Sequence, residues 1–468
     1  MRYSFREILP YYRRNLRVAM PVVLTQLGAA LVGLFDSIMV GQYATTDLAA
    51  VSFSNAIFFT VMVFSMGAVM GITPLVGFTH GELEKAKGEE ANGEWQKANE
   101  QIKSYMTNGL VFTALICLVS FVLLAPCIGL LDYFGQEPEV VACARPYYTL
   151  IVLSILPFLL FCFCKQFLEG LGNTLVAMVI TVVCNLMNIL MNWILIYGHC
   201  GFPAMGAEGA GIGSLIARTL MPICFFLVMA WRKDWRQYLR GIRFSMIRRE
   251  VVGRLFKIGT PIGMQSFCEA FLFTASFIII GWINKETLAA HHIANQMADL
   301  TFMLALGIGA ATTIRVSHQL GHGDLHAVRM ASRASVHLCL MMNTIGAAIM
   351  ILGRNIIPYI FTSDPEVVPI ASTLLVIAGT LQYVDGLQCI GAAMLRGIQD
   401  VRVPMRIAVV AYIIVALPLG LLLTFPVGWG AQGMWISFVI ALAIPAVLYH
   451  IRFHKQLKRL EYGTKTSV

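Results

Sequence analysis

Long apolar runs recur along the whole chain, separated by short polar segments. Each run can cross a membrane as a helix, because a spanning helix needs about 20 apolar residues. The period-two alternation typical of a membrane β-barrel is absent from the sequence. The pattern therefore predicts about twelve spanning helices, at residues 16–41, 53–78, 106–130, 146–168, 173–197, 208–231, 256–283, 290–317, 333–353, 367–394, 403–425 and 430–450.

The composition agrees with a chain that is surrounded by lipid. Hydrophobic residues make up 58% of the 468 residues and charged residues only 13%, about half of the ~25% usual in soluble proteins. These values exclude a soluble globular fold, a disordered chain and a coiled coil. The 11 cysteines lie almost entirely in apolar runs without a CxxC pair. We interpret them as small apolar side chains rather than metal ligands.

The positive charges predict the orientation. If the N-terminus is cytoplasmic, the inner segments hold 30 of the 34 Lys and Arg residues. The outer loops then keep only Arg145, Lys285 and Arg354, and Arg218 lies within a span. Because membrane proteins concentrate Lys and Arg on cytoplasmic loops, we expect both termini to be cytoplasmic, in the inner (plasma) membrane. The net charge of +9 then needs no nucleic-acid partner.

The sequence repeats itself. With a shift of 240, residues 21–81 match residues 261–321 without gaps, and a shift of 227 pairs residues 138–141 with 365–368. The repeat predicts an all-α integral membrane protein with two six-helix lobes in the same orientation, at 1–240 and 241–468. Such parallel repeats are typical of transporters with a midplane site, although a duplication can also be purely architectural. Within the first half, residues 82–103 form an insertion that we expect to be a solvated cytoplasmic helix.

Three carboxylates stand deep inside predicted spans, namely Asp36, Glu269 and Asp385. A charge within the membrane is costly and usually functional. At about 1.5 Å per residue, Glu269 and Asp385 reach the same depth near the midplane. Two carboxylates at one level indicate a cation site or a proton relay. The alternative is that Ser, Gln or backbone groups satisfy them and they serve packing alone.

Asn185, Asn188 and Asn192 are spaced to share one helix face. With Asp36, the amides of Asn188 and Asn192 could supply oxygen ligands for Na⁺ or hydrogen bonds to a protonated carboxyl. Interhelical packing is the alternative. We expect His291 and His292 to lie at the outer membrane interface. Six further polar residues in the spans either line a substrate cleft or make packing contacts: Gln26, Asn55, Gln265, Asn295, Gln296 and Gln382.

Several catalytic motifs are absent from the sequence. GxxxxGK[ST], HExxH and GxSxG do not occur. The chain therefore lacks the nucleotide-binding motif of an ATP-driven pump and the catalytic motifs of these hydrolases. We therefore expect neither an enzyme nor a cofactor, and an ion gradient as the source of energy.

Several motifs resemble the multidrug and toxic compound extrusion (MATE) transporters, most closely the NorM-type branch. They are Phe35–Gly41, Leu48–Ser52, Gly309–Val316, Asp385–Gln388 and Leu395–Gly397, together with Glu269. The resemblance covers both halves of the chain.

The resemblance implies Na⁺- or H⁺-coupled export of small organic cations by alternating access, without ATP and as a monomer. It assigns Na⁺ binding to Glu269 and Asp385 and ion coupling to Asp36, Asn188 and Asn192. Other members carry Asp at the position of Asn192, and here the neutral amide removes one charge.

Two other functions fit the predicted architecture. A flippase for lipid-linked oligosaccharides of the same superfold would need a strongly cationic cavity for its pyrophosphate cargo, whereas the charges within the spans here are mainly acidic. A passive channel or scaffold would account for the spans and the repeat, but not for three carboxylates that the repeat did not copy.

Overall fold

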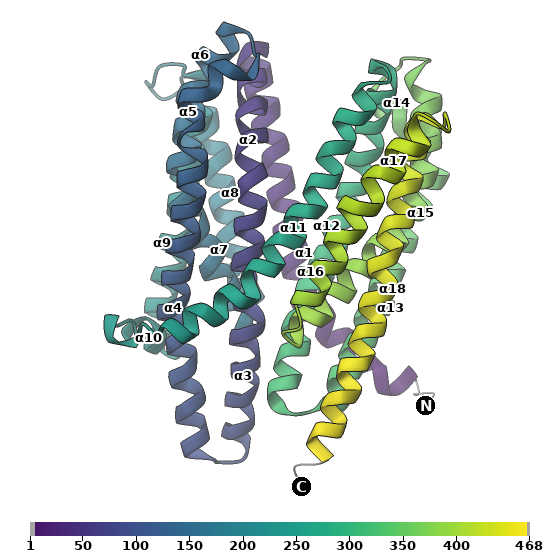
Figure 1. Ribbon diagram of the computed structural model, residues 1–468. Coiled ribbons are helices and arrows are strands. Elements are labelled where there is room, and N and C mark those ends of the chain that lie inside the picture. Colours follow the sequence, from purple (N-terminus) through teal and green to yellow (C-terminus); the bar gives the residue numbers. More distant parts are fainter. Residues whose placement is uncertain (1–4, 466–468) are drawn as a thin grey trace. The chain divides into compact units, whose positions relative to one another are not determined.

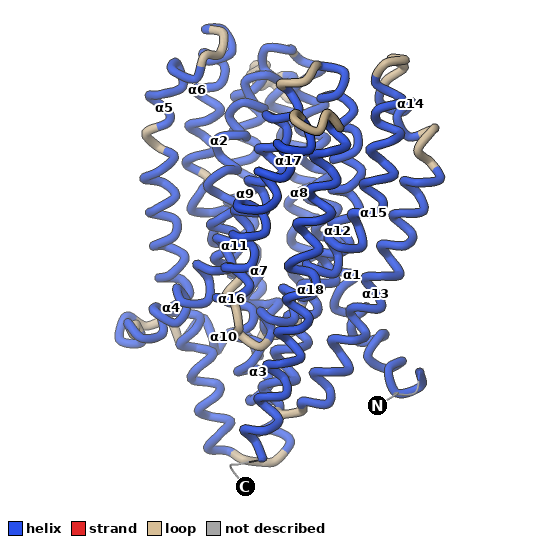
Figure 2. Tube along the Cα trace, turned by 45° about the vertical axis from the view of Figure 1, so that its right-hand side comes forward, coloured by secondary structure: helices blue, strands red, loops and turns tan. Residues whose placement is uncertain are grey.

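The computed structural model describes residues 5–465, with side chains described for 7–462. Every regular element in that range is a helix (Figure 2). The described chain divides into two compact units. One unit is Leu24–Gly263, and the other joins the residues up to Val23 to those from Met264 onward. The predicted boundary between the lobes near residue 240 remains a prediction. It was inferred from the sequence repeat, whereas these two units are defined by contacts between residues.

Both divisions between the units fall inside long helices, α1 (Phe5–Tyr43) and α11 (Arg249–Gly281). Besides the second part of α1 and the start of α11, the unit Leu24–Gly263 contains α2 (Thr45–Val69), α3 (Ile72–Gly88), α4 (Asn92–Leu124), α5 (Cys127–Leu130), η1 (Leu131–Phe134), α6 (Pro138–Leu153), α7 (Ile155–Gly170), α8 (Thr174–Tyr197), α9 (Gly206–Trp231), α10 (Lys233–Arg240) and η2 (Phe244–Met246) (Figure 1).

The other unit begins with the first part of α1 and continues with the rest of α11. Its further helices are α12 (Lys285–His322), α13 (Leu325–Leu352), α14 (Ile357–Phe361), α15 (Val367–Gly397), α16 (Arg402–Val409), η3 (Val410–Ala416), α17 (Leu417–Thr424) and α18 (Gly430–Lys465).

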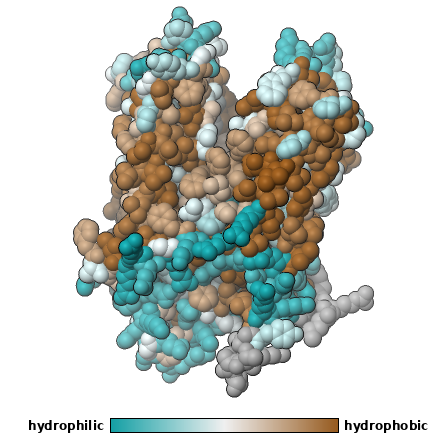
Figure 3. Space-filling view, in the orientation of Figure 1, coloured by the Kyte–Doolittle hydropathy of each residue, from teal (hydrophilic) through white to brown (hydrophobic). Residues whose placement is uncertain are grey.

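The described helices confirm the membrane-spanning fold. Eleven segments are long and apolar enough to cross a membrane, and the bent pair α6–α7 makes a twelfth. Large apolar side chains stay exposed on the outside of these segments, as with Leu186 at 62% and Leu227 at 63%. In Figure 3, hydrophobic side chains cover the middle of each unit and hydrophilic ones gather at the ends. Such exposure is expected only where lipid replaces water as the solvent.

The bend in the span α6–α7 is 42°. Residues 146–168 predicted one straight helix, but the two helices separate at Ser154. Pro157 lies three residues beyond the break and has no N–H to donate to the carbonyl of Leu153. Proline is therefore the physical cause of the bend.

Proline also explains why one helix is broken in the first repeat and continuous in the second. The chain breaks between α2 and α3 at Met70 and Gly71, whereas α12 runs on without interruption. Pro74 stands just beyond the break, and the repeat places Ile314 at the equivalent position. A side chain on Gly71 would collide with the backbone of Gly259, so the broken turn also allows close packing against α11.

The insertion 82–103 is not a separate helix. It extends α3 and α4, which are joined by a short turn at residues 89–91 (Figure 1). Figure 1 shows the two extensions side by side beyond the spans. The residues are helical as predicted, but they form a hairpin.

The eleventh span, Arg402–Thr424, is α-helical only at its two ends. Its middle, η3, is a π-helix, in which each N–H bonds to a carbonyl five residues earlier. The next α-helical piece, α17, begins at Leu417, and Pro418 is its second residue. Because proline cannot donate to the carbonyl four residues before it, the wider turns relieve a hydrogen-bonding conflict at this point.

Candidate ion-coupling site

Asp36 and the asparagine stripe meet in the unit Leu24–Gly263. Asn192 Nδ2, on α8, donates to Asp36 Oδ1, on α1, at 2.6 Å. Asn188 and Asn192 are buried, so the stripe faces the interior of the unit as predicted. The carbonyl oxygens of both side chains are buried and lack a hydrogen-bond partner among the described residues. These oxygens and the carboxylate are a donor set that suits a monovalent cation.

A fixed cation lies near this carboxylate. Arg218, on α9, donates from Nη1 to Ser154 Oγ at 2.7 Å. Its guanidinium stacks over the rings of Phe58 and Phe158, at 5.1 Å and 5.0 Å from the ring centroids. Arg218 interacts electrostatically with Asp36 without forming a direct ion pair. The sequence placed Arg218 within a span but did not predict its neighbours.

A second buried pair lies in the same unit. Lys165 Nζ is 3.9 Å from Glu169 Oε1 and donates to Gln26 Oε1 at 3.4 Å. Both Lys165 and Glu169 belong to α7, so Lys165, which the count of inner charges above places in a loop at 165–172, lies within a helix. Asn55 Oδ1 accepts from Tyr147 Oη at 3.2 Å. The expectation that the charges within the spans are mainly acidic is wrong for this unit, where lysine and arginine accompany the carboxylates.

Glu269 and Asp385 are brought together by a third residue in the other unit. Gln388 Nε2 donates to Glu269 Oε1 at 2.7 Å and contacts Asp385 Oδ1 at 3.5 Å. The two carboxylate oxygens are therefore at most 6.2 Å apart, the sum of these distances. Gln388 Oε1 is buried and has no hydrogen-bond partner within the described chain. Two carboxylates and one free amide oxygen are ligands that Na⁺ accepts, and a proton shared by the carboxylates would serve equally.

A further carboxylate lies close to this group. Asp299, on α12, accepts a hydrogen bond from Asn295 Nδ2 at 2.9 Å and interacts electrostatically with Asp385. Sequence reasoning overlooked Asp299, although an aspartate inside the apolar run 290–317 was a usable signal. Among the described residues, Glu269 and Asp385 have no lysine or arginine in ion-pair contact, and Arg396 interacts with Glu269 electrostatically from a longer distance.

The remaining predicted polar residues in this unit differ in their surroundings. Gln265 is buried against α18, where Nε2 is 3.5 Å from Tyr449 Oη. The backbone carbonyl of Gln382 accepts from Asn343 Nδ2 at 2.8 Å, and the Gln382 side chain is buried. Gln296 is exposed. Gln265 therefore makes a packing contact, Gln382 keeps a buried side-chain Nε2 without a partner among the described residues, and the Gln296 side chain is accessible.

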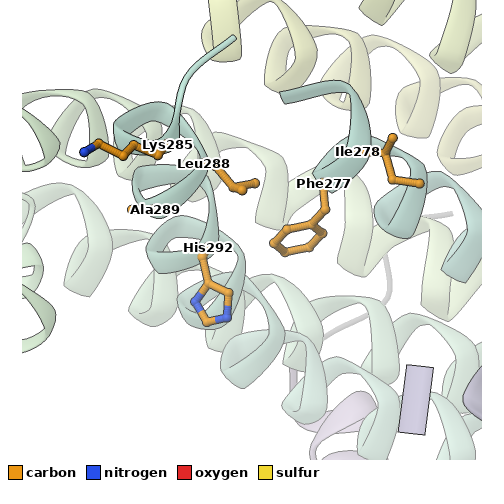
Figure 4. A pocket seen from close by; sticks show the side chains of 6 residues that line it. All are labelled: Phe277, Ile278, Lys285, Leu288, Ala289 and His292. Atoms are coloured by element: carbon orange, nitrogen blue, oxygen red, sulfur yellow. The ribbon is translucent and has the colours of Figure 1, made fainter. Parts of the chain in front are cut away.

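The histidine pair divides between two surroundings. His291 is fully buried, with its Nδ1 accepting from Trp435 Nε1 at 3.0 Å and its Nε2 3.1 Å from Ser276 Oγ. His291 is thus a core residue, and the expectation that it lies at the membrane interface is wrong. His292 is exposed and faces an open apolar pocket of about 520 Å³ (Figure 4). The pocket is lined by Phe277, Ile278, Lys285, Leu288, Ala289 and His292.

The sequence profile of the MatE family matches residues 21–194 and 261–422. The chain belongs to the MatE family. The two matched stretches begin 240 residues apart and fall one in each half of the sequence repeat.

Relatives agree with this membership. A probable multidrug resistance protein NorM of Xylella fastidiosa (strain 9a5c) is 31% identical over 454 residues, which covers 96% of this MatE chain and 93% of the relative. A protein of the same name from Xanthomonas axonopodis pv. citri (strain 306) is 32% identical over 447 residues, with coverage of 95% and 94%.

Solved structures show the same fold. The eukaryotic MATE transporter AtDTX14 superposes with a TM-score of 0.83 at 19% identity, covering 97% of this chain and 98% of that one. An outward-facing multidrug resistance MATE family transporter gives 0.82 at 18% identity, covering 96% of each chain. The family resemblance, the membrane fold and the expectation of a transporter rather than an enzyme are thereby confirmed.

Proposed function

We propose that this multi-pass membrane transporter is a secondary antiporter, which exports small organic cations in exchange for Na⁺ or H⁺ by alternating access. The coupling ion would bind at Glu269 and Asp385, with Gln388 as a third ligand. The bound ion and the cationic substrate would compete for the same negative charge, which couples their movements.

The observation that carries this proposal is the charge balance of the two units. Glu269 and Asp385 share one neutral amide and have no basic side chain in contact among the described residues. Asp36 has Arg218 as a nearby resident cation. Arg396 interacts with Glu269 in the same way, but there two carboxylates share one cation, whereas Asp36 has Arg218 to itself. A second, uncompensated carboxylate is costly inside a membrane, so the pair favours an exchangeable cation. At Asp36, Arg218 already offsets the charge, so we assign Asp36, Asn188 and Asn192 a secondary role in coupling.

The substrate would contact accessible polar groups within each unit. Asn55 and Gln296 are the accessible candidates, whereas Asn295 is buried beside Asp299 and Gln26 is held by Lys165. We further propose that the protein functions as a monomer in the inner membrane, with the basic ends of its spans in the cytoplasm. The extreme terminal residues, on which part of that orientation argument relied, lie outside the described residues.

The two rivals make different predictions. Arg218 and Lys165 supply some of the positive charge that a pyrophosphate-bearing lipid would need, but the carboxylates of the other unit oppose such cargo. A passive channel would never accumulate substrate against its gradient.

Efflux of a fluorescent organic cation from proteoliposomes tests the proposal. We would impose a Na⁺ gradient with the pH gradient collapsed, and then the reverse. Uphill substrate movement in either arm supports antiport and identifies the ion. Glu269→Gln should abolish driven efflux in a folded protein, whereas Glu137→Gln, an exposed loop carboxylate, should have no effect. Downhill flux alone in both arms would contradict the proposal.

A further inference from the structure

A basic pocket lies beyond the end of α9, lined by none of the residues proposed above for transport. It has a volume of about 730 Å³ and lies within the unit Leu24–Gly263. Its lining consists of the basic residues Lys103, Lys233, Arg236, Arg240 and Arg243, with Glu100, Gln237, Gly241, Ser245 and Met246.

The positive charge of this pocket is mostly uncompensated. Glu100 pairs with Lys103 at 2.7 Å. The other four basic residues have no carboxylate in ion-pair contact within the described range. Burial and the nearby Asp234 raise the pKa of Tyr238 to about 12, so this phenol adds no negative charge at neutral pH. Several unpaired cations converging on one hollow are the features of a site for phosphate groups.

The local helix holds these side chains in place. In α10, Trp235 and Tyr238 are buried, and Tyr238 packs against Phe167 with ring centroids 5.9 Å apart. Lys233, Arg236 and Arg240 are spaced to share the opposite, exposed face.

The coil that follows α10 is fixed to α4. The buried Asn108 donates from Nδ2 to the carbonyl of Met246 and accepts from the N–H of Arg248. A side chain on Gly241 would press on the stem of Lys103, so the coil and α4 lie in close contact. The pocket is therefore built by packing and does not depend on chance surface side chains.

The surroundings place the pocket at the membrane surface. Trp231 ends the span α9 and is 90% exposed. Phe244, the first residue of η2, is 93% exposed. Aromatic residues in such positions anchor a protein at the level of the lipid headgroups. Figure 3 shows hydrophilic side chains gathered beyond the hydrophobic middle of the unit, and Figure 1 shows α10 beside α4.

We propose that this pocket binds the headgroup of an anionic phospholipid, with its acyl chains beside Trp231 and Phe244. Four unpaired cations exceed the single charge of one phosphodiester, so a headgroup with two phosphodiesters fits the pocket better. Basic pockets beside membrane spans bind such lipids through charge and hydrogen bonds together. The proposal rests on membrane insertion alone and is independent of the coupling ion.

Lipid titration of the purified full-length protein in a neutral detergent tests the proposal. Native mass spectrometry and the melting temperature would follow binding of phosphatidylcholine, phosphatidylglycerol and diphosphatidylglycerol. We expect diphosphatidylglycerol to bind most tightly, phosphatidylglycerol less tightly and phosphatidylcholine most weakly. Replacing Arg236, Arg240 and Arg243 together by Gln should weaken diphosphatidylglycerol about 100-fold, since each cation contributes about 1 kcal/mol at a membrane surface.

A matched control removes the same charge elsewhere. Lys455, Lys458 and Arg459 are exposed on α18, and their joint replacement by Gln should leave lipid binding unchanged. If the control variant bound diphosphatidylglycerol as weakly as the pocket variant, the effect would be general electrostatic attraction to the surface, and the proposal would be overturned. Equal binding of phosphatidylcholine, or full competition by inorganic phosphate, would overturn it as well. Should the triple variant fail to fold, Arg243→Gln alone, in the coil, should still weaken binding about fivefold.

Discussion

Replacing Glu269 by Gln gives the sharpest test of the charge balance described above. The change keeps the size of the side chain and removes one of two carboxylates whose oxygens lie at most 6.2 Å apart, the sum of their distances from Gln388 Nε2. The matched variant is Asp36→Asn, which removes one carboxylate charge from the unit that holds Arg218.

The magnitude follows from these distances. At an effective dielectric constant of about 20, two negative charges ~6 Å apart repel by about 3 kcal/mol, and a cation ~4 Å from a carboxylate gains about 4 kcal/mol. The pair therefore attracts a monovalent ion while its members repel each other. Losing Glu269 should weaken the binding of the coupling cation by about 2–4 kcal/mol, or roughly 30- to 700-fold. Asp36→Asn should change the affinity for the coupling cation less than about threefold, because Arg218 already offsets the charge of Asp36.

Isothermal titration of detergent-solubilised protein with NaCl at fixed pH and ionic strength measures this affinity. If protons alone drive transport, the same variants are compared by the protons released when drug binds. Retained cation affinity in Glu269→Gln, together with a large loss in Asp36→Asn, would refute the reasoning. A melting temperature within a few degrees of the parent protein shows that both variants are folded.

Other substitutions test the surrounding contacts. Arg218→Met should create a second, Asp36-dependent Na⁺ site, seen as an increase in stoichiometry; Arg218→Lys should not create one. Asn192→Ala removes the hydrogen bond to Asp36 and should cost about 1.5–3 kcal/mol, read as a lower melting temperature, while an unchanged temperature would show that the bond adds no stability. His291→Phe leaves Trp435 Nε1 without its acceptor and should cost about 1–3 kcal/mol in the same assay, with substrate transport retained in the folded fraction.

Much of the fold follows from the sequence because lipid imposes long apolar runs on every span. The three carboxylates were equally visible, since charge is rare in such runs. Depth along a helix could also be counted, and it placed Glu269 and Asp385 at one level. Counting residues does not give the rotation of one helix against another, so the bridging amide of Gln388 became apparent only from the packing of α11 against α15.

The errors also have physical sources. Lys165 stands near the end of a predicted run and was assigned to a loop, although its flexible stem reaches Gln26 from within α7. His291 was placed at the interface by its position at the start of a run, but Trp435 and Ser276 bury it. In both cases the partner lies far away in sequence, where a pattern of spacing carries no information.

The π-helical segment of the eleventh span bears on how this chain can change length. An α-helix turns about 100° per residue, so the gain or loss of one residue within a span re-aims every side chain beyond it. In α15, the gain or loss of one residue before Asp385 would turn the Asp385 carboxylate away from Glu269, which lies on α11. The segment Val410–Ala416 already holds more residues per turn. Deleting one residue there would convert the segment to α-helical geometry, and the side chains at the far end of the span would keep their orientation. Tyr412, within this segment, lies near Glu269 and Asp385, so a deletion there would re-aim one side chain beside the ion site and leave the rest of the span in place.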